Sequence, residues 1–145
     1  MKTTEYNLNS LEETSKVASE LASTFKGGEV IFAYGPLGAG KTQFFKDIGK
    51  ALGVAKTINS PTFNLIKIYE GKFTFYHVDC YRLENVDEEK KDLGLDEVLG
   101  DKDIITYIEW PEFASKEVLS YKPVIKLHFS YVDEEQRKLV IEDER

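Results

Sequence analysis

The sequence has little from which disulfide bonds or a membrane span could be built. Cys80 is the single cysteine, so no disulfide can form within the chain. No apolar run approaches the roughly 20 residues that a membrane-spanning helix needs. Residues 1–25 contain several glutamates and no long apolar core, unlike a signal peptide. These absences predict a cytoplasmic protein without a membrane partner.

Basic residues are also scarce. Lys and Arg number 19 against 26 Asp and Glu, which gives a formal net charge of -7. Direct binding of a nucleic-acid backbone needs clustered Lys and Arg, so the composition does not support it. The length of 145 residues is typical of one domain. We therefore expect residues 1–145 to form a single domain.

Glycine, by contrast, is concentrated in a functional pattern. Residues 35–42 read Gly-Pro-Leu-Gly-Ala-Gly-Lys-Thr, which matches the phosphate-binding loop Gly-x-x-x-x-Gly-Lys-Thr. In such a loop, backbone N–H groups surround phosphate oxygens, the lysine reaches the β- and γ-phosphates, and the threonine hydroxyl can ligate Mg²⁺. An apolar run over 29–34 precedes the loop, and a helical pattern over 43–52 follows it, as the motif requires. The expected nucleotide-binding residues here are Gly38, Ala39, Gly40, Lys41, Thr42 and Gln43.

The remaining patterns predict an α/β fold. A capping box over Ser10 to Glu13 indicates a first helix, with apolar positions continuing to Phe25. Extended runs are predicted over 63–69, 73–79, 104–109, 124–131 and 137–142. The first two runs are expected to form one hairpin, and the last two another. Strands that alternate with helices around a phosphate loop predict a P-loop NTPase domain with a central mixed sheet flanked by helices.

Two of the predicted strands end in a carboxylate. Asp79 closes the run 73–79, and Glu109 closes the run 104–109. A nucleoside triphosphate arrives with Mg²⁺, which needs a carboxylate besides the Thr42 hydroxyl, and hydrolysis needs a group that orients or deprotonates water. Spacing alone does not decide which acid holds the metal and which acts on water.

Three further features have two interpretations each. Thr62, in Ser-Pro-Thr-Phe about twenty residues after the loop, is either a switch residue that senses the γ-phosphate or part of a turn. His77 and Cys80 flank Asp79, a pattern that could also suggest a metal site. Successive strand positions face opposite ways and no second Cys/His pair is present, so we expect His77 to be a hydrogen-bonded core residue. Trp110 is either a core aromatic or an exposed recognition residue.

The motifs together resemble the TsaE family, also called YjeE, of small bacterial P-loop ATPases. The resemblance rests on residues 35–42, on Ser-Pro-Thr-Phe at 60–63, on His-Val-Asp-Cys-Tyr-Arg-Leu at 77–83 and on Glu-Trp-Pro at 109–111. It implies a role in forming N6-threonylcarbamoyladenosine at position 37 of tRNA, together with TsaD-like and TsaB-like partners. ATP hydrolysis would support turnover of the partner complex, which would contact the tRNA.

The resemblance also implies roles for individual residues. Lys41 would bind the β/γ-phosphates, Thr42 and Glu109 would ligate Mg²⁺, and Asp79 would be the acid needed for hydrolysis. Thr62 would belong to a switch segment and Trp110 to the surface beside the nucleotide. Ser10 and Arg137 fall near places where family members touch the nucleotide.

Without the resemblance, three other classes remain to be weighed. A small-molecule kinase usually brings arginines to the transferred phosphate, and only Arg82, Arg137 and Arg145 are present. A GTP switch is disfavoured because the chain has no Asn-Lys-x-Asp segment. A module that binds ATP without hydrolysing it is barely opposed by the sequence.

Overall fold

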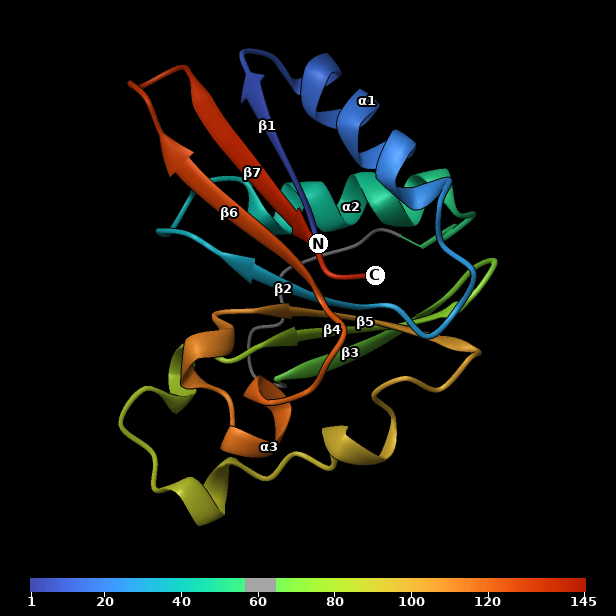
Figure 1. Cartoon of the computed structure of the whole chain (residues 1–145), viewed down its shortest axis with the longest axis vertical. Coiled ribbons are helices and arrows are strands. Elements are labelled where there is room, and N and C mark those ends of the chain that lie inside the picture. Colours follow the sequence, from blue (N-terminus) through green and yellow to red (C-terminus); the bar gives the residue numbers. More distant parts are fainter. Residues whose placement is uncertain (57–64) are drawn as a thin grey trace.

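A mixed β-sheet runs through the molecule (Figure 1). The computed structural model describes residues 1–56 and 65–145. Within these residues seven strands follow the order β1-β7-β6-β2-β5-β4-β3. Their bounds are β1 Lys2–Leu8, β2 Val30–Tyr34, β3 Ile66–Glu70, β4 Thr74–Asp79, β5 Ile104–Glu109, β6 Ile125–Tyr131 and β7 Arg137–Asp143.

The centre of the sheet is parallel and its margins are antiparallel. β2 pairs in parallel with both β5 and β6, and β4 pairs in parallel with β5. The antiparallel pairs are β3 with β4, β6 with β7, and β1 with β7. The carboxyl ends of β2, β4 and β5 therefore meet at one edge, where ligands of such sheets bind.

Helices cover the sheet on both faces (Figure 1). α1 (Leu11–Ala22) and α2 (Lys41–Ala51) pack with one set of alternating strand residues, which includes Ile31, Phe75 and Tyr107. Residues of the other set, such as Phe32 and Ile108, pack with the segment that contains α3 (Lys116–Leu119). Short 3₁₀ helices on this second side span Tyr81–Leu83, Glu88–Lys91, Leu95–Glu97 and Pro111–Phe113.

The start of α1 follows the predicted capping pattern with one difference. The Ser10 hydroxyl accepts a hydrogen bond from Glu13 N at 3.1 Å, as an N-cap residue does. The Glu13 carboxylate bonds back to the N–H of Asn9, rather than to that of Ser10, at 3.1 Å. The helix ends at Ala22, and Phe25 lies beyond it but remains buried.

The predicted fold class is confirmed, while two elements escaped prediction. Both hairpins are present, and β5 has the predicted bounds Ile104–Glu109. β1 was missed because its charged residues hide the alternation of Thr4, Tyr6 and Leu8, although only Leu8 is fully buried. The one-turn helix α3 was also missed. Among the described residues, no helix is long and apolar enough to cross a membrane.

Candidate nucleotide-binding site

The phosphate loop connects β2 to α2 at the carboxyl edge of the sheet. Gly35 approaches β6 so closely that an added Cβ would lie 2.6 Å from the carbonyl oxygen of Phe129. Gly40 has a φ of 109° and is the N-cap residue of α2, and no side chain caps this end. The first turn of a helix leaves N–H groups without intrahelical acceptors, so α2 offers them to an anion.

Lys41 points back over the loop. Its side chain is 4% exposed, its Nζ donates to the carbonyl oxygen of Gly35, and the same Nζ lies 3.7 Å from the centroid of the Trp110 ring. Burial lowers the pKa of the ammonium group, and the nearby carboxylates of Glu109, Glu112 and Asp79 oppose this shift. The ammonium group of Lys41 is thus held by a carbonyl and an indole ring.

Thr42 and Glu109 are joined across the loop. The Thr42 hydroxyl lies 3.0 Å from Oε1 and 2.9 Å from Oε2 of Glu109, which is 3% exposed. This hydroxyl and carboxylate form an oxygen donor set of the kind that Mg²⁺ prefers. The two residues that the family resemblance implied as metal ligands therefore lie in contact.

Asp79 is the strand neighbour of Glu109. The two are register partners at the ends of β4 and β5, and the Asp79 Oδ1 accepts a hydrogen bond from Tyr81 N at 3.0 Å. Burial raises the pKa of the Asp79 carboxyl, and the charge of Glu109 adds to this, while the bond from Tyr81 acts against it. A carboxylate with a raised pKa is a better proton acceptor.

A cavity of about 360 Å³ brings these groups together. The strand ends, the loop and the start of α2 each contribute to its wall. Its lining residues are Leu37, Gly38, Gly40, Lys41, Thr42, Gln43, Asp79, Glu109 and Trp110. The structure thus gathers five of the six predicted loop residues, both predicted acids and the tryptophan around one space, while the buried Ala39 does not line it.

Trp110 is held in an unusual backbone conformation. It is the one described non-glycine residue with positive φ, 57°, in the left-handed region. Its half-buried ring packs against Tyr81, with centroids 4.9 Å apart, and is stacked on Phe113 at 5.7 Å. The turn after Glu109 therefore directs an aromatic ring over Lys41. Because this ring is half-buried, Trp110 is neither a core residue nor a fully exposed one.

A second, smaller cavity of about 180 Å³ shares the lining residues Gly38, Gly40 and Gln43 with the first. Arg137 lines it, and its Nη2 donates to the Gly38 carbonyl oxygen at 3.3 Å. Ser10 does not line this cavity; its hydroxyl caps α1, while its neighbours Leu8 and Leu11 do line it. The full lining is Leu8, Leu11, Thr14, Gly38, Ala39, Gly40, Gln43, Phe129 and Arg137.

Other sequence predictions have mixed outcomes. Thr62 lies outside the described residues. His77 is the expected hydrogen-bonded core residue: it is fully buried, and its Nε2 lies 2.6 Å from Glu109 Oε2. Cys80, directly after β4, is buried in the core on the opposite side of the sheet, and burial raises the pKa of its thiol to about 12. Within residues 1–56 and 65–145, no cluster of His, Cys, Asp or Glu has the geometry of a metal site.

Sequence reasoning missed two contacts that support the site. It did not join His77 to Glu109, although an interval of two along a strand places His77 on the same face as Asp79. It also missed Tyr107, whose buried hydroxyl donates to the carbonyl oxygen of Lys41 at 2.7 Å. Because Tyr107 precedes Glu109 by two residues, the same alternation could have indicated it.

The fold and the site define a P-loop protein of the nucleotide-binding class. A family model described as threonylcarbamoyl adenosine biosynthesis protein TsaE matches residues 8–139. The crystal structure of Bacillus subtilis YdiB superimposes with a TM-score of 0.79 and 26% identity, covering 99% of this chain and 87% of that one.

Curated relatives agree with this match. A Rickettsia felis protein is 42% identical over 132 residues, covering 90% of this chain and 74% of the relative. A Bacillus subtilis protein is 38% identical over 119 residues, covering 81% and 73%. Both are named tRNA threonylcarbamoyladenosine biosynthesis protein TsaE. The chain belongs to the TsaE family.

Proposed function

We propose that this chain, as one P-loop ATPase domain over residues 1–145, hydrolyses ATP in the formation of threonylcarbamoyladenosine at position 37 of tRNA. Hydrolysis is slow in the isolated chain and supports turnover of a transferase complex of TsaD-like and TsaB-like proteins. The partner complex contacts the tRNA, and the whole reaction takes place in the cytoplasm. Membership of the TsaE family supports the pathway.

The observation that carries the ATPase proposal is the meeting of Lys41, Thr42, Asp79 and Glu109 in one cavity. Lys41 binds the β/γ-phosphates once its ammonium group leaves the Gly35 carbonyl. Thr42 and Glu109, already in contact, would hold Mg²⁺. When bound, that ion would neutralise developing charge on the phosphate oxygens.

Asp79 and the smaller cavity complete the proposed site. Asp79 orients or deprotonates the attacking water, a role that its raised pKa supports. The cavity beside Arg137 and the start of α1 after Ser10 accommodate the nucleoside part of ATP, since this cavity shares loop residues with the larger one but is not lined by Asp79. Thr62 is proposed as the switch residue that senses the γ-phosphate.

The test is a reconstituted transfer reaction with unmodified tRNA and TsaD-like and TsaB-like proteins. Modified adenosine is measured per transferase molecule with this chain, without it, and with its Lys41→Ala variant. We expect several turnovers only with the unaltered chain. A Lys126→Ala variant, which removes a surface lysine paired with Glu144, is the matched control and should act like the unaltered chain. Equal multiple turnover without the chain would contradict the proposal.

A further inference from the structure

A histidine that the proposed function leaves unused lies directly behind Glu109. His77 is fully buried on β4, and its Nε2 lies 2.6 Å from Glu109 Oε2. Its ring is stacked on Phe45, with centroids 4.2 Å apart and an interplanar angle of 24°. The Tyr107 ring meets it edge-on at 6.0 Å. Aromatic contacts on two sides therefore fix the orientation of this imidazole.

The contacts of Glu109 divide its two oxygens into different roles. Oε2 is bonded to both His77 and Thr42, whereas Oε1 is bonded to Thr42, at 3.0 Å. An ionised carboxylate only accepts hydrogen bonds, so Nε2 of His77 carries the hydrogen and donates it. The buried Nδ1 of His77 has no hydrogen-bond partner, which favours the tautomer with hydrogen on Nε2.

We infer that His77 is a positioning residue for Glu109. Its Nε2–H holds Oε2 from behind, so the carboxylate cannot rotate away and Oε1 stays directed, with the Thr42 hydroxyl, toward the cavity. A hydrogen bond of this kind behind a metal-ligating carboxylate typically affects metal affinity about 10- to 100-fold. The inference rests on the proposed Mg²⁺ role of Thr42 and Glu109.

The strand register explains why a histidine at this position can reach Glu109. His77 is the register partner of Tyr107, and Asp79 is the register partner of Glu109. His77 and Glu109 are thus diagonal neighbours on one face of the sheet, within reach of long side chains. One face of β4 therefore supplies both the acid beside the cavity and the imidazole that orients its neighbour.

The first test needs no nucleotide. Long-range ¹H–¹⁵N spectra of the apo protein report which nitrogen of His77 carries hydrogen, and His77→Phe identifies its signals against those of His128. We expect the Nε2–H tautomer, and we expect Glu109→Gln to shift the Nε2 signal of His77. Hydrogen on Nδ1 alone, or an Nε2 signal unaffected by Glu109→Gln, would overturn the inference.

The second test measures affinity for a non-hydrolysable ATP analogue with Mg²⁺ and with EDTA, through the fluorescence of the single tryptophan, Trp110. His77→Phe keeps the ring stacked on Phe45 but removes the donor. We expect it to lose about 10-fold in Mg²⁺-dependent affinity, with affinity in EDTA unchanged. His77→Gln, whose amide can donate from the position of Nε2, should recover most of the loss, and the shorter His77→Asn should not.

The control is Thr106→Val, a buried substitution on the opposite face of β5 that removes a hydroxyl without a partner. This variant should bind the ATP analogue with the affinity of the unaltered chain. Unchanged Mg²⁺-dependent affinity in His77→Phe, or an equal loss in EDTA, would overturn the positioning role. If Mg²⁺ fails to raise the affinity of the unaltered chain, the proposed metal role is wrong, and the imidazole spectra alone decide whether His77 holds Glu109.

Discussion

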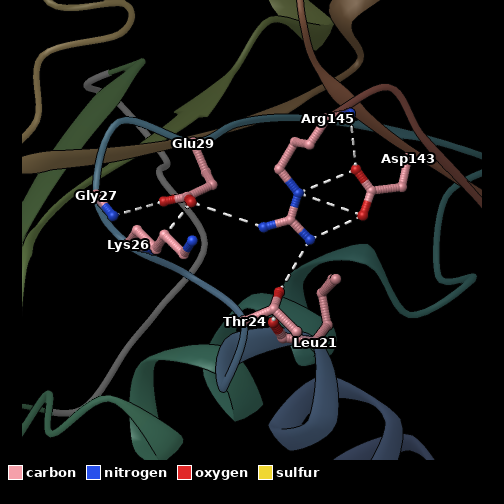
Figure 2. A network of polar contacts seen from close by, with 7 residues as sticks. All are labelled: Leu21, Thr24, Lys26, Gly27, Glu29, Asp143 and Arg145. Atoms are coloured by element: carbon pink, nitrogen blue, oxygen red, sulfur yellow. Dashed lines mark hydrogen bonds and ion pairs between the residues drawn. The ribbon is translucent and has the colours of Figure 1, made fainter. Parts of the chain in front are cut away.

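The charged side chains at the two ends of the central strands have partners of opposite kinds. At the carboxyl end, Lys41 contacts a backbone carbonyl and an indole ring, and Glu109 contacts a hydroxyl and an imidazole. At the other end, Arg145 meets carboxylates directly (Figure 2). Its Nη2 lies 2.8 Å from Asp143 Oδ2, and its Nη1 lies 3.6 Å from Glu29 Oε2.

The arginine end is also closed by backbone bonds. Glu29 accepts from the N–H groups of Lys26 at 2.9 Å and Gly27 at 2.8 Å, and Arg145 donates to the Thr24 hydroxyl at 2.9 Å (Figure 2). Charges here are matched by opposite charges. At the loop, by contrast, Lys41 contacts a carbonyl and an indole ring that a phosphate can replace, and Glu109 contacts a hydroxyl and an imidazole that leave it able to take up a metal ion. The difference separates a ligand site from a structural ion pair.

The largest expected effect comes from Asp79→Asn at the loop end. Asn keeps an oxygen that can accept from Tyr81 N, so the fold and the nucleotide affinity should change little. Loss of the carboxylate should lower the rate of ATP hydrolysis about 100-fold or more, as for other catalytic bases. Steady-state phosphate release measures this. An unchanged rate would contradict the role of Asp79.

The pH dependence of the unaltered chain offers a second measurement on Asp79. The ionised carboxylate is the active form, and burial raises its pKa above the ordinary 3.8. Hydrolysis should therefore fall as the pH drops through that raised pKa, and the Asn variant should lack this step. A step at or below pH 3.8 would argue against the buried setting of Asp79.

Next in size is the effect of Lys41→Ala on binding. A hydrogen bond between charged groups contributes about 1.5–3 kcal/mol, so affinity for ATP should fall about 10- to 100-fold. Calorimetric titration measures this, with Lys126→Ala as the matched surface control. The free energy of unfolding should change little, because the ammonium group gives up a carbonyl and a ring rather than a carboxylate. A large loss of stability would make Lys41 a structural residue like Arg145.

Arg145→Ala should show the reverse pattern. It removes the partner of Asp143 and one partner of Glu29, whose side chain is 8% exposed. Partly exposed pairs contribute less than buried ones, so we expect a loss of about 1–2 kcal/mol in the free energy of unfolding, measured with urea. Affinity for ATP should stay the same. If it falls as in Lys41→Ala, the two ends are not independent.

The two ends also differ in how far the sequence predicts them. The loop motif and the strand ends at Asp79 and Glu109 follow from local spacing, which the P-loop geometry constrains. The pairing of Thr42 with Glu109 is implied only by the family resemblance, because spacing leaves open which acid lies beside the threonine. The contacts of Arg145 with Glu29 and Thr24 join residues more than a hundred positions apart. The sequence of β1 shows only a weak alternation of apolar and polar residues. His77 lies between these cases: its face is readable from strand alternation, but its bond to Glu109 depends on the β4–β5 register.

The smallest predicted effect concerns Asp143→Asn. The hydrogen bond from the Arg145 side chain is the main cause that lowers the pKa of the Asp143 carboxyl below its ordinary 3.8. A lowered folded-state pKa stabilises the fold above the unfolded value, and this contribution disappears as the pH falls through the folded value. The free energy of unfolding of the unaltered chain should therefore exceed that of Asp143→Asn by up to about 1 kcal/mol at pH 7. Urea unfolding from pH 7 to pH 3 should show the gap narrowing only below about pH 4. If this difference in the free energy of unfolding narrows already between pH 7 and pH 5, the effect belongs to another group. A constant difference would show that Arg145 and Asp143 are not coupled through charge.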